Sequence, residues 1–196
     1  MHDGKRGAGS VRIIGGRWRG RRIPVPEAPD LRPTPDRVRE TLYNWLQGRL
    51  AGSRVLDLYA GSGALGLEAV SRGAAHATLV ERERSVAAVL RASVEKLGAT
   101  AAEVAVIEAD ARSVLAAGPA RLGGAYDLVL LDPPFAAAED GHLCTLLAQD
   151  GWLGKSACIY LEGPSDRGVP ELPGGWQIAR TLTAGAVTAR LLRPAN

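Results

Sequence analysis

Short apolar runs alternate along the chain with longer segments in which apolar residues recur at helical spacing. Runs that are apolar throughout and bounded by turn residues are typical of buried strands, whereas a spacing of three or four indicates an amphipathic helix. This alternation predicts a parallel sheet covered by helices on both faces. The expected strands are residues 54–58, 77–81, 104–107, 126–131 and 157–162, and the expected helices are residues 36–50, 64–72, 85–97, 111–117 and 139–149.

The two ends of the chain depart from this alternation. Residues 176–182 and 187–192 both have strand character, and the four residues between them are too few for a parallel crossover, which predicts an antiparallel hairpin. The result is an α/β, Rossmann-like sheet of seven strands with an antiparallel last hairpin. Residues 11–14 and 21–25 predict a separate N-terminal β-hairpin, after a polar stretch over residues 1–10 that we expect to be disordered.

A proline-rich segment joins the N-terminal hairpin to the sheet. Residues 24–35 contain five prolines, which restrict φ and predict a stiff linker that wraps the domain. Asp36 then has the side chain and the position of a helix N-cap. We therefore expect residues 1–30 to form a basic tail and hairpin arm, and residues 31–196 to form the domain that contains the sheet.

The sequence Asp132-Pro133-Pro134-Phe135 follows the expected strand 126–131. Proline has no N–H and a fixed φ, so backbone carbonyls here stay free to accept hydrogen bonds. Asp132 adds a second acceptor, and Phe135 offers a face on which a planar base can stack. Together they can hold a flat amine. The alternative is a strand that ends in a proline turn with a capping aspartate.

Gly61, Gly63 and Gly66 follow the first expected strand and match the GxGxxG pattern of nucleotide-binding turns. The pattern alone is weak evidence, because NAD-dependent dehydrogenases share it. Asp57, just before the turn, would repel a pyrophosphate and attract a cationic amino-acid group, which favours a sulfonium nucleotide over NAD. Glu81, at the end of the second strand, has the spacing of a ligand for a ribose diol.

Asp110 follows the third expected strand. It could accept a hydrogen bond from an adenine amine, or it could be the N-cap of the helix over residues 111–117, and the sequence supports the two equally. The residues expected to line the cofactor site are Asp57, Tyr59, Ala60, Gly61, Ser62, Gly63, Glu81, Arg82, Asp110 and Ala111.

The net charge of +3 is unevenly distributed. Residues 1–22 carry a balance of +6, and the rest of the chain carries −3. A basic arm on a slightly acidic body favours phosphate binding, although a solvated basic tail would have the same composition. Trp18 could be displayed on the hairpin or could pack against the core. The residues expected to contact nucleic acid are Arg12, Arg17, Trp18, Arg19, Arg21, Arg22, Arg32, Arg37 and Arg39.

No group of residues in the sequence has the spacing of a metal site, so we expect no metal. Cys144 and Cys158 lie far apart and are expected to be small buried hydrophobes, and the scattered histidines have no partner at ligand spacing. No apolar run is long enough to span a membrane, and the charged N-terminal segment lacks the apolar core of a secretory signal. These features favour a cytoplasmic protein.

The glycine turn, the two acids and Asp-Pro-Pro-Phe, in this order, resemble an S-adenosylmethionine-dependent amino-group methyltransferase. Residues 12–26 and 31–46 closely resemble the RsmD family, and the likeness covers nearly the whole chain, including residues 57–66, 132–135 and 151–153. The family comprises bacterial enzymes that methylate a guanine N2 of small-subunit ribosomal RNA. The resemblance implies S-adenosylmethionine as cofactor, 16S rRNA in the small ribosomal subunit or its assembly intermediate as partner, and a monomer.

The resemblance also implies how the amine would be activated. Asp132 and the Pro133 carbonyl would accept hydrogen bonds from the two amine protons, and Phe135 would stack on an unpaired or flipped base. The first ten residues and Pro35, where a threonine is expected, depart from the family pattern. Neither departure touches an expected chemical group.

Three other functions remain possible on the sequence. A DNA adenine methyltransferase would share Asp-Pro-Pro-aromatic but usually has a separate recognition domain. An NAD-dependent dehydrogenase would explain the glycines but not residues 132–135. A non-enzymatic RNA-binding assembly factor would need the arm but not the acids at Asp57, Glu81 and Asp132.

Overall fold

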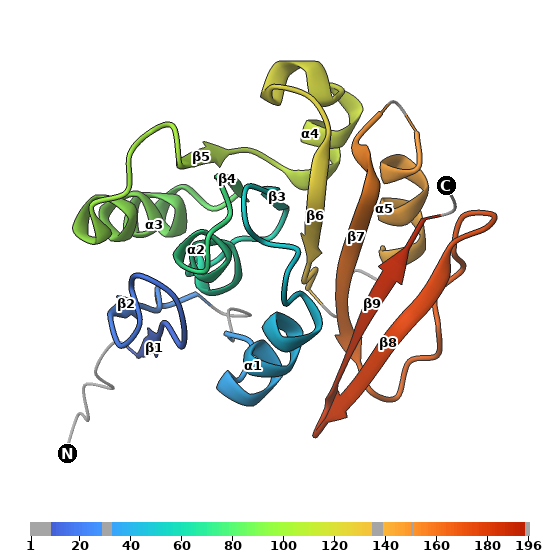
Figure 1. The fold of residues 1–196 in the computed structure, drawn as a ribbon, viewed down its shortest axis with the longest axis horizontal. Coiled ribbons are helices and arrows are strands. Elements are labelled where there is room, and N and C mark those ends of the chain that lie inside the picture. The colour runs from blue at the N-terminus through green and yellow to red at the C-terminus, as the bar shows by residue number, and fades with distance from the viewer. Residues whose placement is uncertain (1–8, 29–32, 135–138, 150, 195–196) are drawn as a thin grey trace, which may run out of the picture.

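The computed structural model describes residues 9–28, 33–134, 139–149 and 151–194. Seven strands form its main sheet: β3 (Arg54–Asp57), β4 (His76–Glu81), β5 (Val104–Glu108), β6 (Tyr126–Leu131), β7 (Leu153–Pro164), β8 (Gln177–Ala184) and β9 (Val187–Arg193). Their order across the sheet is β5-β4-β3-β6-β7-β9-β8 (Figure 1). The first five pair in parallel, whereas β9 is antiparallel to both β7 and β8. The predicted α/β, Rossmann-like fold with an antiparallel last hairpin is confirmed.

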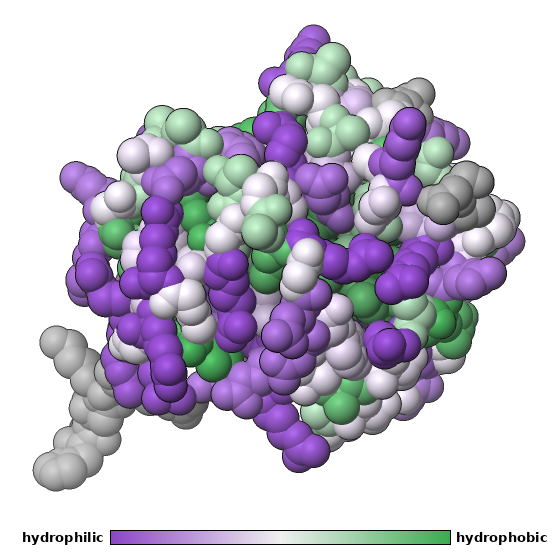
Figure 2. Space-filling view, viewed as in Figure 1, coloured by the Kyte–Doolittle hydropathy of each residue, from purple (hydrophilic) through white to green (hydrophobic). Residues whose placement is uncertain are grey.

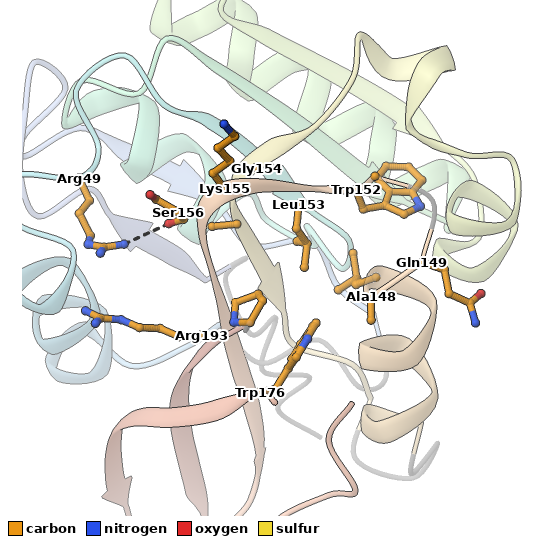
Figure 3. Close-up of a pocket in the computed structure, with 14 residues that line it drawn as sticks. Arg49, Ala148, Gln149, Trp152, Leu153, Gly154, Lys155, Ser156, Trp176 and Arg193 are labelled. Carbon is orange, nitrogen blue, oxygen red and sulfur yellow. Dashed lines mark hydrogen bonds between the residues drawn. The ribbon is translucent and has the colours of Figure 1, made fainter. Parts of the chain in front are cut away.

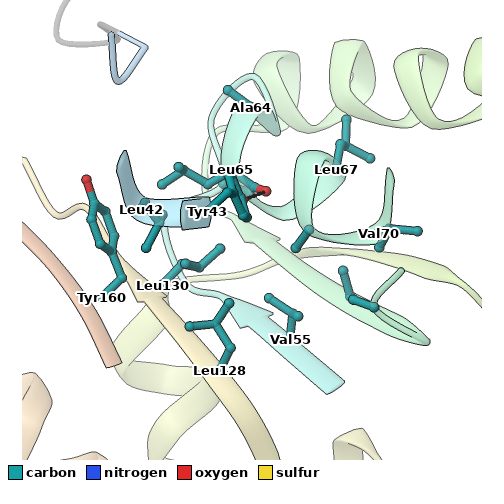
Figure 4. Packing of buried hydrophobic residues seen from close by; sticks show 14 of the residues in the cluster. Leu42, Tyr43, Val55, Ala64, Leu65, Leu67, Val70, Leu128, Leu130 and Tyr160 are labelled. Atoms are coloured by element: carbon teal, nitrogen blue, oxygen red, sulfur yellow. Dashed lines mark hydrogen bonds between the residues drawn. The ribbon is translucent and has the colours of Figure 1, made fainter. Parts of the chain in front are cut away.

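Helices cover both faces of the sheet, as the alternating pattern predicts. One core combines the sheet with α1 (Asp36–Trp45), α2 (Ala64–Ser71) and α3 (Arg84–Leu97). Figure 4 shows this core where Leu42 and Tyr43 of α1 lie over Leu128 and Leu130 of β6. A second core, on the other face, combines the sheet with α4 (Ala111–Ala116) and α5 (Asp140–Leu147). A short 3-10 helix, η1 (Pro119–Leu122), leads into β6.

The N-terminal hairpin consists of β1 (Ser10–Arg12) and β2 (Arg22–Pro24), which pair antiparallel beside α2 and α3 (Figure 1). The predicted hairpin is therefore confirmed, with shorter strands. Its apolar side chains Val11, Ile13, Trp18 and Ile23 are buried in the same core as α1 and α2. The hairpin is thus part of the packed structure. Residues 1–8, within the expected disordered tail, and the expected boundary at residues 30 and 31 lie outside the described residues.

A tight backbone contact docks the hairpin on the end of α2. The Arg17 N–H donates to the Ser71 carbonyl at 2.8 Å, and the Trp18 N–H donates to Ser71 Oγ at 2.9 Å. Gly16 has a φ of +77°, and a Cβ there would lie 1.8 Å from the Ser71 carbonyl oxygen. Glycine is therefore required at position 16 both by conformation and by space.

Two expected boundaries are wrong. Helix α1 ends at Trp45, short of residue 50, because Gly48 adopts a φ of +80° that does not continue a helix. Its N-cap is Pro35, and the Asp36 carboxylate makes no capping hydrogen bond. Asp36 instead accepts a 2.6 Å hydrogen bond from Arg39.

Arg39 lies at the centre of a buried polar network that joins the hairpin, α1 and α2. Its side chain is 0% exposed and pairs with the equally buried Glu68 at 2.6 Å. It also donates to Asp36 and to the carbonyls of Arg12 and Thr34. Glu68 is paired a second time by Arg72, at 2.8 Å. Buried ions need such saturation, because each one loses several kcal/mol of hydration.

Most of the face shown in Figure 2 is hydrophilic, with apolar atoms in small separate patches. Among the described residues, Val169 and Ile178 are the large hydrophobic side chains that are exposed. The structure describes no helix that is long and apolar enough to cross a membrane.

The buried network generates a first prediction. Arg39→Met keeps the volume of the side chain but removes the donor to Glu68 Oε2 and to three other acceptors, while Arg72 still pairs with Glu68 Oε1. We expect the free energy of unfolding, measured by urea denaturation, to fall by about 3–5 kcal/mol. Arg37→Met, at an exposed position of the same helix, is the matched control and should change it by less than about 0.5 kcal/mol. Equal stabilities of the two variants would contradict the proposed role of the network.

The docking of the hairpin generates a second prediction. Gly16 and Gly20 both have positive φ, at +77° and +83°, but a Cβ on Gly20 would meet no atom within 4 Å. Gly20→Ala should lower the free energy of unfolding by about 1 kcal/mol, the conformational cost alone. Gly16→Ala should lower it by about 3 kcal/mol or more, because the hairpin must move off Ser71. Similar losses in thermal or urea unfolding would show that this contact is unimportant.

Candidate active site

The glycine-rich turn between β3 and α2 has positive φ angles and packs closely against neighbouring side chains. Gly61 and Gly63 have φ angles of +51° and +82°. A Cβ on Gly63 would lie 2.5 Å from Leu90, and a Cβ on Gly66 would lie 2.2 Å from Leu79. The turn can therefore bring the start of α2 close to the carboxyl ends of β3 and β4, where open α/β sheets bind their ligands.

Asp57, the last residue of β3, is a buried acid that forms no ion pair with the described residues. It is 1% exposed, and its Oδ2 accepts a 3.0 Å hydrogen bond from the Gly66 N–H. Burial raises the pKa of Asp57 to about 7, although hydrogen bonds from the Gly66 and Tyr59 backbones oppose the rise. No ion pair among the described residues includes Asp57. A cationic group placed here would compensate its charge.

Glu81, the last residue of β4, faces the glycine turn. Its Oε2 accepts from the Gly61 N–H at 3.0 Å, and its Oε1 accepts from the Glu83 N–H at 2.8 Å. Both oxygens keep a further lone pair for a hydroxyl donor. The neighbouring Arg82 pairs with Glu83 at 3.3 Å and is 65% exposed.

Asp110 is the N-cap of α4. Its Oδ1 accepts from the Arg112 and Ser113 N–H groups at 3.0 and 3.1 Å, which confirms the capping alternative. An adenine contact through the other oxygen stays a prediction. The other expected cofactor residues lie along the same edge: Ala60, Ser62 and Ala111 are buried, and Tyr59 is partly exposed.

Asp132 follows β6 and meets a second acid that the sequence analysis did not single out. Glu162, near the end of β7, is 4% exposed and accepts from Tyr160 Oη at 2.6 Å and from Thr34 Oγ1 at 3.0 Å. Burial raises the pKa of Asp132 well above its usual range, and the charges of Glu162 and Asp57 raise it further. The Thr34 hydroxyl, which donates to Glu162, lies close enough to oppose this rise. Three carboxyl groups thus lie along the carboxyl edge of β3, β6 and β7.

The rest of the Asp-Pro-Pro-Phe motif is described in part. Pro133 is buried and Pro134 is exposed. Phe135, like Arg32 from the expected nucleic-acid surface, lies outside the described residues.

The structure corrects two expected nucleic-acid contacts. Trp18 is 6% exposed and packs in the core, and Arg39 is fully buried in the network around Glu68. Neither side chain is available to RNA in this arrangement. Both are buried because the hairpin docks on the helices: Trp18 packs at the end of α2, and the hairpin covers Arg39 near the start of α1.

The other expected arginines are exposed, and most hold a partner. Arg17 pairs with Glu103 at 2.6 Å and lies 4.2 Å over the Trp18 ring. Its hydrogen bond is the largest cause that lowers the pKa of Glu103 to about 2. The remaining partners are weaker: Arg12 lies 3.7 Å from Asp36, Arg21 donates to the Lys96 carbonyl, and Arg22 donates to Ser10, while Arg19 and Arg37 are exposed.

A cavity of about 780 Å³ lies at the other end of the sheet, around the start of β7. Figure 3 shows Arg49, Lys155, Arg193 and Trp176 around it. None of the expected site residues lines this cavity. It is separate from the acids at the carboxyl edge.

The fold and the acids at its carboxyl edge define the class of protein: a Rossmann-like methyltransferase of the S-adenosylmethionine-dependent type. The model of the family described as Conserved hypothetical protein 95 matches residues 11–193. The chain belongs to this family, which is the RsmD family predicted from the motifs.

The relatives agree with this assignment. The chain is 46% identical over 185 residues to ribosomal RNA small subunit methyltransferase D of Escherichia coli (strain K12), covering 94% of this chain and 90% of that protein. The protein of the same name from Haemophilus influenzae is 39% identical over 183 residues, or 93% of each chain. The solved structure of yhhF from Escherichia coli superposes with a TM-score of 0.85 at 42% identity, covering 95% of this chain and 99% of that one.

The described residues contain no group of three or more histidine, cysteine or acidic side chains that could hold a metal. Cys144 and Cys158 are free thiols, and both are buried. Burial raises the pKa of both thiols, to about 12 for Cys144.

Proposed function

We propose that this protein transfers a methyl group from S-adenosylmethionine to N2 of a guanine in the RNA of the small ribosomal subunit. The observation that carries the proposal is the pairing of two acid sites on one edge of the sheet. Asp57 and Glu81 flank the glycine turn, and Asp132 stands two strands from Glu81, next to Pro133. The names of the Escherichia coli and Haemophilus influenzae relatives support the RNA substrate.

The residues at the glycine turn fit this cofactor. The uncompensated carboxyl group of Asp57 suits a cationic amino group, and Glu81 suits the two ribose hydroxyls, since both of its oxygens retain a lone pair. When bound, S-adenosylmethionine supplies an electrophilic methyl group. The closely packed glycines let the backbone approach the nucleotide.

At the other acid site the chain prepares the nucleophile. The lone pair of an aromatic amine is delocalised into its ring, so the nitrogen must become more tetrahedral before it attacks. Hydrogen bonds from the two amine protons to Asp132 and the Pro133 carbonyl favour that change, and Phe135 would stack on the base. Holding both reactants aligned contributes on the order of 7–11 kcal/mol.

The exposed arginines of the hairpin and of α1 form the surface proposed for RNA: Arg12, Arg17, Arg19, Arg21, Arg22 and Arg37. Arg12 and Arg17 hold exposed ion pairs, and Arg21 and Arg22 donate to exposed oxygens. Exposed ion pairs stabilise a protein by about 1 kcal/mol or less. Phosphates can therefore replace these partners at small cost, with the release of counterions from the RNA.

A third prediction concerns cofactor binding and pH. Asp57 is largely protonated below its pKa of about 7, whereas a bound ammonium group favours the carboxylate. Binding of S-adenosylmethionine should therefore release a proton, and the affinity should rise as pH increases from about 5.5 to 7. Titration calorimetry in buffers of different ionisation enthalpy measures the release. Asp57→Asn is the control and should bind more weakly without this proton release, and stronger binding of NAD would contradict the proposal.

A fourth prediction separates methyl transfer from cofactor binding. Asp132→Asn keeps the shape of the side chain but weakens its capacity to accept, so single-turnover methyl transfer should fall about 100-fold or more. The calorimetric affinity for S-adenosylmethionine should stay within about threefold, a difference of less than 1 kcal/mol. The substrate is small-subunit particles from a strain that lacks the gene, and mass mapping of the rRNA identifies the modified guanine. Near-normal rates would refute the role of Asp132, and the absence of any modified guanine would refute the function.

A further inference from the structure

Glu162 lies beside Asp132 because of the strand register. β6 and β7 are parallel, with Leu130 opposite Tyr160 and Leu131 opposite Leu161. The next residues along the two strands are Asp132 and Glu162, and neighbouring strands lie about 4.8 Å apart. The charge of Glu162 is, after burial, the largest cause that raises the pKa of Asp132. The carboxyl groups of Asp132 and Glu162 therefore lie close enough for their charges to interact.

Glu162 is buried in a way that packing alone does not explain. It is 4% exposed, and its Oε2 already accepts from Tyr160 and Thr34. No described residue donates a hydrogen bond to its Oε1 or pairs with its charge. Figure 4 shows the hydroxyl of Tyr160 directed away from Leu128 and Leu130, toward the edge of the core. A buried carboxylate without a cation is costly, so an acceptor oxygen held ready here indicates a ligand that donates.

We propose that Glu162 is a specificity-determining residue, whose free Oε1 accepts the N1–H of the target guanine while Asp132 accepts from the adjacent N2 amine. The inference rests on the proposed function and names the contact that would select the base. Tyr160 and Thr34 are positioning residues in this arrangement, because their two hydrogen bonds fix Oε2 and leave Oε1 for the ligand.

The chemistry of the base edges explains the selectivity. Guanine presents two neighbouring donors on its Watson–Crick edge, N1–H and the N2 amine, which match two carboxylate acceptors. Adenine presents a bare N1 lone pair there, and a carboxylate would repel it. Sites built to bond a donor reject analogues that lack it far more strongly than apolar pockets reject a change in size. The acid pair therefore selects guanine, because adenine would lose the hydrogen bonds and its N1 lone pair would be repelled.

The test uses 2-aminopurine, which keeps the 2-amino group but has an acceptor at N1. It is placed in small-subunit RNA at the guanine that the mapping identifies, and the RNA is assembled into particles. With the unaltered enzyme, kcat/KM should favour guanine over 2-aminopurine by about 100-fold or more. In Glu162→Gln the amide oxygen can still accept from Tyr160 and Thr34, while the amide nitrogen faces the base. The kcat/KM of Glu162→Gln for guanine should fall about 10- to 100-fold. Its preference for guanine over 2-aminopurine should narrow by at least about tenfold.

Tyr160→Phe is the matched control, because it removes one hydrogen bond to Glu162 and keeps the carboxylate. It should slow the reaction with both bases and keep the preference. A Glu162→Gln enzyme that is slower but equally selective would show that Glu162 is structural. The preference of the unaltered enzyme tests the proposal even where a variant fails to fold, since equal rates on the two bases would overturn it. Absence of methyl transfer to any guanine would instead refute the proposed function itself.

Discussion

The buried pair of Arg39 and Glu68 is the interaction on which the rest of this structure depends. It joins α1 to α2, and through the Arg12 carbonyl it also joins the N-terminal hairpin. The same guanidinium donates to the Thr34 carbonyl at 3.2 Å. Thr34 in turn donates to Glu162 at the carboxyl edge of the sheet. One buried arginine thereby connects the packing of the hairpin to the position of a hydroxyl in the candidate site.

Buried negative charge is compensated in the Arg39–Glu68 network but not at the carboxyl edge of the sheet. Around Glu68 the negative charge is fully compensated, by Arg39 and Arg72. At the carboxyl edge, Asp57 is buried and Asp132 is half-buried, neither has a described cation beside it, and desolvation raises the pKa of both. A network that only supports the fold can be saturated by the chain itself. The acids that are proposed to bind a ligand remain electrostatically unfavourable until a cation or a hydrogen-bond donor binds to them.

Much of the fold could be predicted because it follows from local patterns. The apolar runs that became β4 and β6, and the glycines before α2, carry their signal within a few residues. The proposed roles of Asp57, Glu81 and Asp132 come from their positions at strand ends, which the sequence also shows. The N-cap role of Asp110 was one of two interpretations that the sequence supported equally, and the structure confirms it while the adenine contact stays a prediction.

What the sequence could not provide depends on contacts between distant segments. The sequence indicates an exposed Arg39 near the start of a helix, and it leaves open whether Trp18, between two short strands, is displayed or packed in the core. Each is buried because the hairpin folds back over α2, a contact across 53 residues in the case of Trp18 and Ser71. Glu162 follows an apolar run, as Glu81 does, but it belongs to none of the motifs that the sequence shows. Its importance becomes visible when the register of β6 and β7 sets it beside Asp132.

The docking of the hairpin also changes how the basic arm must be understood. Removing residues 1–22 would remove Val11, Ile13 and Trp18 from the core and the Arg12 carbonyl from Arg39. A truncated protein would therefore lose stability along with its positive charge, and a loss of RNA binding could not be assigned to either cause. Charge and fold separate at Arg19, which is exposed and can be neutralised without touching the buried contacts. The arm is best regarded as a part of the core whose outer side carries the arginines.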